Sequence, residues 1–154
     1  MKRKPANPYS LKHTVIEAEI DRLNHVNNKV YLEWMEHIAW QHSLSVGIDE
    51  ALIRALEKVM VIGRHEMNFH SACYLGERLQ IDTWVSAPSS AKKRTRFYQI
   101  TREKDGKRVF TAQTLWICMD IKTQKSTAIP NEFIEPYQDQ YTNSLRPLHE
   151  RMHG

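Results

Sequence analysis

The chain has 154 residues, of which 41% are hydrophobic and 26% are charged, and its formal net charge is +4. This length fits one domain, and the composition is that of a folded globular protein rather than a disordered chain. Its apolar runs are all shorter than the roughly 18 residues that a membrane-spanning helix needs. The small positive excess suits an anionic ligand, but it does not by itself indicate nucleic-acid binding.

The N-terminal segment and the number of cysteines indicate the cellular location of the protein. The N-terminus is basic, but no apolar segment follows it, which argues against a secretory signal peptide. Only two cysteines are present, Cys73 and Cys118, so we expect free thiols and a cytoplasmic location.

The first predicted elements are a strand and a long helix. Residues 13–20 alternate in polarity and predict a strand. Residues 29–45 carry a broad apolar face and predict a largely buried helix. Asn27 or Asn28 can cap the start of this helix, and Gly47 can end it.

A short helix and four strands follow. Asp49 is a suitable N-cap for a helix that runs to about residue 57. Alternating polarity then predicts strands over residues 58–70, 79–87, 94–103 and 108–121. The segment Lys104-Asp105-Gly106-Lys107 predicts a tight hairpin turn between the last two strands.

The order of these elements predicts the fold. Strands joined by short turns pair in an antiparallel manner, and the apolar face of a sheet must be covered by another element. We therefore predict an α+β fold in which an antiparallel five-stranded sheet wraps around one long central helix. Because one helix covers five strands poorly, we also expect an oligomer. The chain after Pro130 is polar and is predicted to be a tail.

The segment between the first strand and the long helix carries the candidate chemistry. It contains Asp21, His25, Asn27 and Asn28 within eight residues. A helix start offers unpaired N–H groups and a partial positive charge, which can polarise a carbonyl. A nearby carboxylate can act as a base or as a nucleophile, and His25 could orient a carbonyl or a water. The alternative interpretation is that these residues only cap a turn and a helix.

Two sequence blocks resemble a known family. Residues 21–31 read D-R-L-N-H-V-N-N-K-V-Y, which is similar to the D-x-x-G-H-V-N-N-x-x-Y pattern of the 4-hydroxybenzoyl-CoA thioesterase-like group of hotdog-fold acyl-CoA thioesterases. Residues 74–85, Y-L-G-E-R-L-Q-I-D-T-W-V, resemble the strand entry of the same family. The resemblance covers about residues 9–136.

This resemblance implies one hotdog domain over residues 1–154, with a core at about 9–136 and a polar tail at about 137–154. It also implies a homodimer or a homotetramer, whose active site lies at the interface between subunits. The expected substrate is an acyl-CoA or an acyl-ACP thioester, and no cofactor or metal is expected.

The resemblance also implies roles for single residues. Asp21 falls on the catalytic carboxylate, acting as base or nucleophile, and the backbone N–H near Asn28 falls on the donor that polarises the thioester. His25 and the Asn28 side chain fall on positions that line the reacting centre, and Asn27 and Tyr31 fall among the substrate-binding positions.

One departure from the family pattern concerns the turn itself. Asn24 stands where the family has glycine. A glycine there points to a left-handed backbone, and asparagine is the next most tolerant residue, so we expect the turn to be kept.

A basic turn is the candidate for holding coenzyme A. The phosphates of coenzyme A need cations, and Ser90, Lys92, Lys93 and Arg94 lie together between two predicted strands. A charge run at a hairpin is equally typical of a solvated turn.

The sequence also leaves functions other than hydrolysis open. The alternative to an enzyme is a non-catalytic acyl-CoA-binding hotdog protein, and nucleic-acid binding would rest on the net charge alone. Residues 149–153 read H-E-R-M-H and match a zinc-protease motif, but a polar terminal segment does not provide the long buried helix and third ligand that zinc chemistry needs.

Overall fold

The computed structural model describes residues 4–140. Its elements, in chain order, are β1 (Tyr9–Thr14), the 3-10 turn η1 (Glu17–Glu19), α1 (Asn28–Ser45), α2 (Glu50–Leu56), β2 (Lys58–Phe69), β3 (Arg78–Val85), β4 (Lys93–Arg102), β5 (Arg108–Asp120), α3 (Asn131–Ile134) and the 3-10 turn η2 (Glu135–Tyr137).

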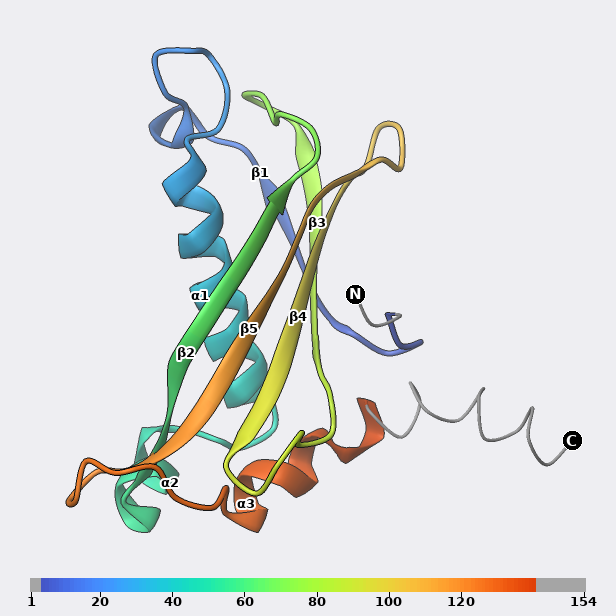
Figure 1. Cartoon of the computed structure of the whole chain (residues 1–154). Helices are drawn as coiled ribbons and strands as arrows, with labels where there is room; N and C mark the ends of the chain where they lie inside the picture. The colour runs from blue at the N-terminus through green and yellow to red at the C-terminus, as the bar shows by residue number, and fades with distance from the viewer. Residues whose placement is uncertain (1–3, 141–154) are drawn as a thin grey trace, which may run out of the picture.

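One antiparallel sheet in the order β1-β3-β4-β5-β2 curls around α1, which runs along its inner face (Figure 1). The predicted hairpin joins β4 and β5, and Gly106 in its turn has a φ of 67°, a conformation that favours glycine. The predicted α+β hotdog architecture, an antiparallel five-stranded sheet around one long helix, is confirmed. In Figure 1 the start of α1 lies at the top of the molecule, whereas α2 and α3 lie at the bottom.

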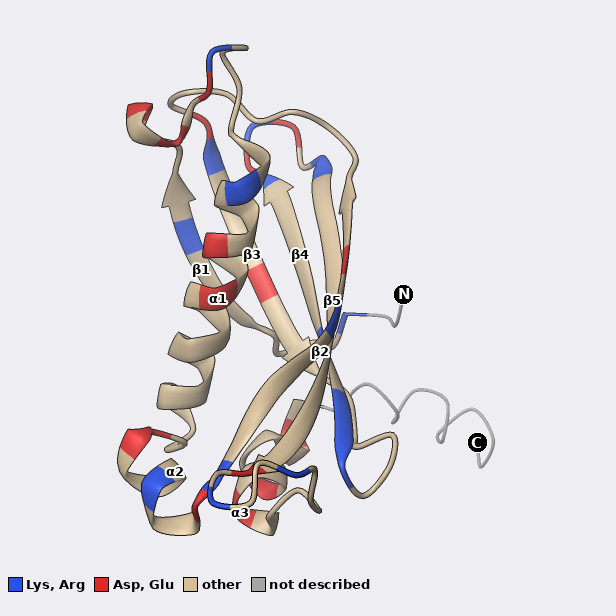
Figure 2. Ribbon diagram, turned by 60° about the vertical axis from the view of Figure 1, so that its left-hand side comes forward, with Lys and Arg blue, Asp and Glu red and all other residues tan. Residues whose placement is uncertain are grey.

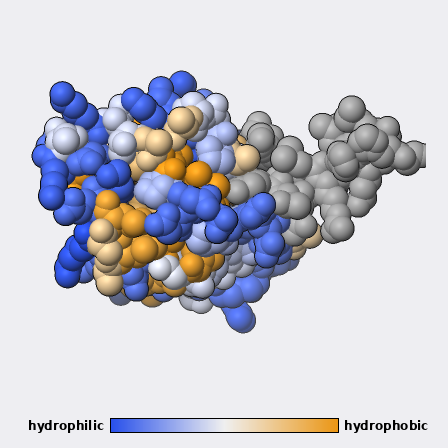
Figure 3. Space-filling view, turned by 90° about the horizontal axis from the view of Figure 1, so that it is seen from below, coloured by the Kyte–Doolittle hydropathy of each residue, from blue (hydrophilic) through white to orange (hydrophobic). Residues whose placement is uncertain are grey.

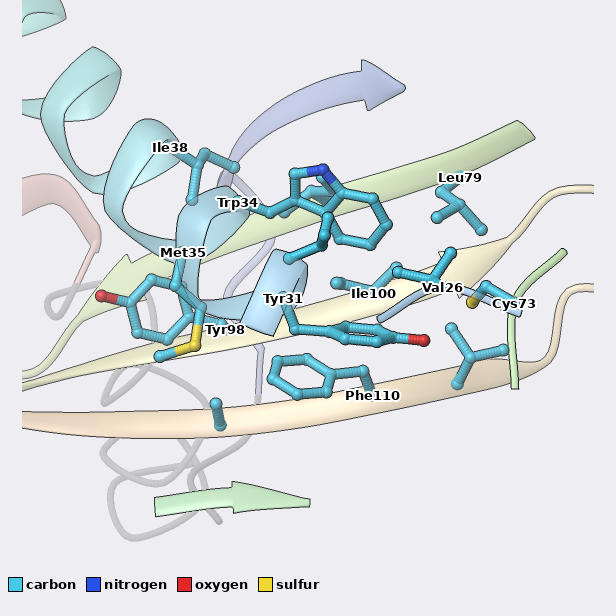
Figure 4. Packing of buried hydrophobic residues seen from close by; sticks show 14 of the residues in the cluster. Val26, Tyr31, Trp34, Met35, Ile38, Cys73, Leu79, Tyr98, Ile100 and Phe110 are labelled. Atoms are coloured by element: carbon cyan, nitrogen blue, oxygen red, sulfur yellow. The ribbon is translucent and has the colours of Figure 1, made fainter. Parts of the chain in front are cut away.

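The main core fills the space between α1 and the sheet. The helix contributes buried side chains spaced three or four residues apart, as an amphipathic helix should: Val30, Tyr31, Trp34, Met35, Ile38, Ala39 and His42. The sheet contributes Leu79, Tyr98, Ile100 and Phe110, among others (Figure 4). This packing fixes the position of the helix start relative to the sheet.

Local signals set the ends of the helices as predicted. The Asn27 side chain accepts a hydrogen bond from the N–H of Lys29 at the start of α1. Gly47, with a φ of 86°, follows the last turn of α1. Asp49 caps α2 by accepting from the N–H of Leu52 at 2.9 Å. Among the described helices, none has both the length and the apolar character needed to cross a bilayer.

The prediction of a strand over residues 13–20 was wrong in its position. The first strand ends at Thr14, and η1 replaces the rest of the predicted strand. The Glu19 carboxylate accepts from the N–H of Ile16 at 2.9 Å, which closes the turn. Ile16 is 54% exposed, so the apolar alternation does not correspond to a buried face.

The prediction of a tail directly after Pro130 was wrong for residues 131–140. Phe133 and Tyr137 are buried in a second core cluster with Ile48 and Val85, and Gln140 accepts from the N–H of Val85 at 3.2 Å. The segment therefore belongs to the fold and closes its lower end. The H-E-R-M-H sequence and most of the predicted tail at 137–154 lie outside the described residues.

Charged side chains are distributed over both ends of the molecule. Figure 2 shows lysine and arginine at the loops, the strand ends and α2, interspersed with aspartate and glutamate. Both cysteines are buried free thiols, as the sequence predicted.

Candidate active site

A short loop between η1 and α1 brings the predicted catalytic residues together. The N–H of Asp21 donates to the carbonyl of His25 at 3.0 Å, and the N–H of Asn24 donates to the carbonyl of Asp21 at 3.0 Å. Asn24 has a φ of 66°, which confirms that asparagine takes over the left-handed position where glycine was expected. These two hydrogen bonds form a tight turn, which keeps the side chains of Asp21 and His25 close to each other.

The Asp21 carboxylate is partly held and partly free. Its Oδ1 accepts from the N–H of Leu23 at 2.8 Å, and its Oδ2 lies 3.8 Å from Nδ1 of His25. The two side chains are 23% and 34% exposed, so both can meet a substrate or a water. One fixed oxygen and one accessible oxygen suit a general base or a nucleophile.

The start of α1 lies directly after this turn and offers a hydrogen-bond donor. The Asn27 side chain accepts from Lys29, and the Asn27 carbonyl accepts from Val30. The backbone N–H of Asn28 donates to no acceptor within residues 4–140, and Asn28 is exposed. Because the first N–H groups of a helix carry its positive partial charge, this donor suits a carbonyl oxygen that becomes negative during a reaction.

Glu19 is a supporting residue that the sequence did not reveal. Its carboxylate accepts from Nε1 of Trp34 at 2.8 Å and lies 2.8 Å from Nε2 of His13. Its carbonyl accepts from the N–H of Asn27 at 2.9 Å. Burial raises the pKa of Glu19, but hydrogen bonds from Ile16, His13 and Trp34 outweigh burial and lower it overall. Glu19 thus ties the turn that carries Asp21 and His25 to β1 and α1.

Tyr31, which was predicted to bind the substrate, is buried in the core of the protomer. It is 3% exposed, its ring stacks on Phe110 with centroids 4.8 Å apart, and Phe69 and Trp34 meet it edge-on (Figure 4). Burial is the main cause that raises the pKa of its hydroxyl, and Cys73 is its polar neighbour. Through these ring contacts Tyr31 packs the start of α1 against the sheet.

The predicted coenzyme A residues lie at the other end of the sheet from Asp21 (Figure 1). Ser90, Lys92 and Lys93 are exposed in and beside the connection of β3 to β4. Arg94 differs from them, because it is 4% exposed and donates to the carbonyls of Phe133 and Ser86 at 2.7 and 3.3 Å. One protomer therefore does not bring the basic turn to Asp21, and Arg94 points into the core rather than to solvent.

Fold and site together define a hotdog protein with a carboxylate beside the open start of its central helix. The chain belongs to the thioesterase-like superfamily, whose pattern matches residues 16–136.

The chain is also similar to individual proteins. It is 28% identical over 116 residues to the long-chain acyl-CoA thioesterase FadM of Escherichia coli K12, a match that covers 75% of this chain and 86% of FadM. The structure of the Staphylococcus aureus protein SAV2348 in complex with CoA has a TM-score of 0.82 at 19% identity, covering 93% of this chain and 89% of that one. The 1,4-dihydroxy-2-naphthoyl-CoA thioesterase Slr0204 of Synechocystis has a TM-score of 0.75 at 17% identity, covering 89% and 97% of the two chains.

Proposed function

We propose that this protein hydrolyses an acyl-CoA thioester to a free acid and a thiol. The observation that carries the proposal is that the Asp21 carboxylate lies in the turn before the N–H of Asn28, which has no acceptor within residues 4–140. The names of the relatives support the substrate class, because FadM is a long-chain acyl-CoA thioesterase and the SAV2348 structure contains CoA.

The proposed reaction divides the work between four residues. The N–H of Asn28 donates a hydrogen bond to the thioester carbonyl oxygen and stabilises the negative charge that forms on it. Asp21 takes a proton from water, the oxygen of that water attacks the carbonyl carbon, and the carbon–sulfur bond then breaks to release the thiolate. In the alternative route Asp21 attacks the carbonyl carbon itself, and water cleaves the resulting anhydride. His25 orients the water or the carbonyl, and Asn27 keeps the helix start in place.

We further propose that the active site is completed by a second copy of the chain. The strand β2 is an edge of the sheet, and it exposes Ile62 and Phe69 at 44% and 47%. Antiparallel pairing of two β2 strands would reverse one copy relative to the other. The turn that carries Ser90, Lys92 and Lys93 would then approach Asp21 of the other copy, where it can meet the phosphates of coenzyme A.

The variant Asp21→Asn tests the catalytic role. Asparagine keeps an oxygen for the N–H of Leu23 but cannot take a proton, so we expect kcat to fall by roughly 10²–10⁴-fold. Turnover is followed by free-thiol detection over a panel of acyl-CoA and acyl-ACP substrates, with Asp139→Asn on the surface as the matched control. Near wild-type turnover by Asp21→Asn would contradict the assignment. Binding of acyl-CoA with no turnover by the wild type would favour the non-catalytic alternative.

The paired change Lys92→Glu and Lys93→Glu tests the coenzyme A site. We expect a higher KM for acyl-CoA and little change in kcat, because the two lysines are far from the bond that breaks. An unchanged KM would remove these lysines from the site.

A further inference from the structure

The turn between β2 and β3 carries large apolar side chains where most turns carry polar residues or glycine. The N–H of Glu77 donates to the carbonyl of Tyr74 at 3.1 Å and closes the turn, and Gly76 within it has a φ of 82°. Leu75 at the tip is 58% exposed, and Tyr74 beside it is also exposed. Apolar surface in water is unfavourable, so this turn gains stability when a partner covers it.

Ile16 enlarges the same exposed apolar area. The N–H of Gly76 donates to the carbonyl of Val15 at 3.0 Å, and the N–H of Val15 donates to the carbonyl of Glu77 at 3.0 Å. These hydrogen bonds hold the exposed Ile16, the residue after Val15, beside the turn. The strand that precedes Val15 is β1, the edge of the sheet opposite β2. The proposed pairing of two β2 strands therefore uses the other edge of the sheet.

Cations surround the turn, and the acidic residues that pair with them lie deeper. Leu75, Arg78 and Lys104 line one hollow at the upper end of the molecule, where the turn and the hairpin of β4 and β5 lie side by side (Figure 1). The side chains of Arg78 and Lys104 are 75% and 70% exposed, whereas those of their partners Glu103 and Glu77 are only 29% and 8% exposed. The outer layer of this hollow is therefore positively charged.

The lower end of the molecule has a different arrangement of charge. Figure 3 shows hydrophobic residues at the surface there too, and Ile121 is one of the exposed apolar residues of that end. In the ion pair of α2, however, both charges reach the solvent, because the side chains of Arg54 and Glu50 are 77% and 72% exposed. Apolar exposure alone thus does not distinguish the two ends, whereas the outer layer of cations does.

We propose that an upper docking surface, formed by Ile16, Tyr74, Leu75, Arg78 and Lys104, binds an anionic lipid bilayer. The three apolar side chains enter the headgroup region, where the amphipathic ring of tyrosine is well accommodated. The two cations meet the lipid phosphates. A bilayer fits better than a peptide, because the apolar side chains protrude from loops and do not line a groove.

This surface is joined to the candidate active site. The N–H of Val26 donates to the carbonyl of Cys73 at 2.9 Å, so the loop that carries the docking surface contacts the segment that carries Asp21. Docking would therefore hold that segment beside the bilayer. The inference does not depend on the proposed thioesterase activity, because bilayer binding needs no turnover.

Co-sedimentation of the full chain with lipid vesicles tests the proposal. One set of vesicles is phosphatidylcholine with about 30% phosphatidylglycerol, and the other is phosphatidylcholine alone. We expect at least tenfold stronger binding to the anionic vesicles, and weaker binding as sodium chloride is added, because salt screens the attraction. Equal binding to both sets, or binding to neither, would overturn the proposal. Binding of an acidic protein such as acyl-carrier protein without binding of vesicles would also overturn it, and would assign the surface to a protein partner.

A paired charge variant locates the surface. Arg78→Gln with Lys104→Gln is expected to weaken binding to the anionic vesicles by roughly twenty- to thirtyfold, since one cation near such a surface contributes a factor of about five. The matched control is Arg54→Gln with Lys122→Gln, which removes two exposed cations at the lower end and should bind as the wild type does. Equal losses in the two pairs, or no loss in the first, would overturn the proposal.

A paired apolar variant tests insertion into the bilayer. Ile16→Ser with Leu75→Ser is expected to weaken binding at least tenfold, because two large side chains no longer leave water. The matched control is Leu44→Ser with Ile121→Ser, two exposed apolar residues at the lower end, which should bind normally. All four side chains are exposed, so we expect both variants to fold, which circular dichroism checks. Unchanged binding by folded Ile16→Ser with Leu75→Ser would overturn the proposal, and failure of the thioesterase assay leaves each outcome unaffected.

Discussion

Arg96 donates a hydrogen bond from Nη1 to Nδ1 of His42 over 2.9 Å, in the interior between β4 and α1. A guanidinium has only donors, so Nδ1 must be the acceptor and the imidazole is neutral, with its proton on Nε2. Burial, together with the positive charges of Arg96 and Arg94, lowers the pKa of His42 to about 3. Tyr9 stacks on the same ring and Tyr137 meets it edge-on.

The neutral His42 predicts a pH dependence of folding stability. In the unfolded chain this histidine takes a proton near its ordinary pKa of 6.5, whereas in the folded protein it stays neutral down to about pH 3. The unfolded state thus binds one more proton in this window, so the contribution of His42 lowers the free energy of unfolding by about 1.4 kcal/mol for each unit that pH falls. Above pH 6.5 this contribution is constant.

The variant His42→Asn isolates this effect, because asparagine keeps an acceptor for Arg96 but does not titrate. Urea unfolding is measured for both proteins at several pH values between about 4 and 6.5, a range that lies inside the window where only the unfolded histidine is charged. We expect the wild type to lose stability on acidification more steeply than the variant. If the free energy of unfolding depended on pH equally in the two proteins, His42 could not be neutral in the folded state.

The backbone conformation of Asn24, in the turn between Asp21 and His25, leads us to expect different effects from two substitutions there. Its φ of 66° is left-handed, so Asn24→Gly should keep the turn, whereas the β-branched Asn24→Val should cost about 1–2 kcal/mol. Because Asn24 separates Asp21 from His25, the valine variant should also lose thioester turnover. Thermal unfolding and kcat are measured together, with the glycine variant as control. Equal behaviour of the two variants would show that the backbone conformation of this turn is not limiting.

The parts of the fold that the sequence predicted are those where local signals and packing agree. The broad apolar face of residues 29–45 and the Asn27 cap both point to α1, and Asp105-Gly106 fixes the hairpin of β4 and β5. The grouping of Asp21 with Asn28 was also predictable, because a turn of a few residues cannot separate them. The family pattern then gave these residues roles that spacing alone left open.

The errors arose where burial depends on distant parts of the chain. Residues 16–20 alternate in polarity, yet the turn closed by Glu19 leaves Ile16 in solvent. Tyr137 follows a polar segment, yet it packs beside Arg96 and His42. Arg94 follows two exposed lysines, yet it is buried because its guanidinium donates to the carbonyls of Phe133 and Ser86, which are distant in the sequence. No pattern within a short window distinguishes these cases.

Removal of the negative charge of Glu19 is expected to lower both the free energy of unfolding and the catalytic activity. In Glu19→Gln the amide group has one acceptor oxygen, so it cannot accept from Ile16, His13 and Trp34 together. We expect a loss of about 1–3 kcal/mol in the free energy of unfolding, the cost of leaving a buried donor unsatisfied.

The same change should lower kcat, because Glu19 in the turn η1 positions Asn27 and the helix start. The matched control is Glu17→Gln, an exposed residue of the same turn, which should stay within about 0.5 kcal/mol of the wild type. The two variants are compared by urea unfolding and by turnover of one acyl-CoA. A stability loss in Glu19→Gln with unchanged kcat would limit Glu19 to a structural role.

Phe133 predicts that the segment after Pro130 contributes to folding. It is 3% exposed, it packs in the second core cluster with Ile48 and Val85, and its carbonyl accepts from Arg94. Phe133→Ala should therefore lower the free energy of unfolding by about 3–5 kcal/mol, the usual cost of removing a buried aromatic ring. Glu132→Ala, the exposed neighbour on the same turn of α3, is the control and should change it by less than about 0.5 kcal/mol. Urea unfolding of the full chain measures both values, and similar small losses in the two variants would mean that this segment is only loosely attached.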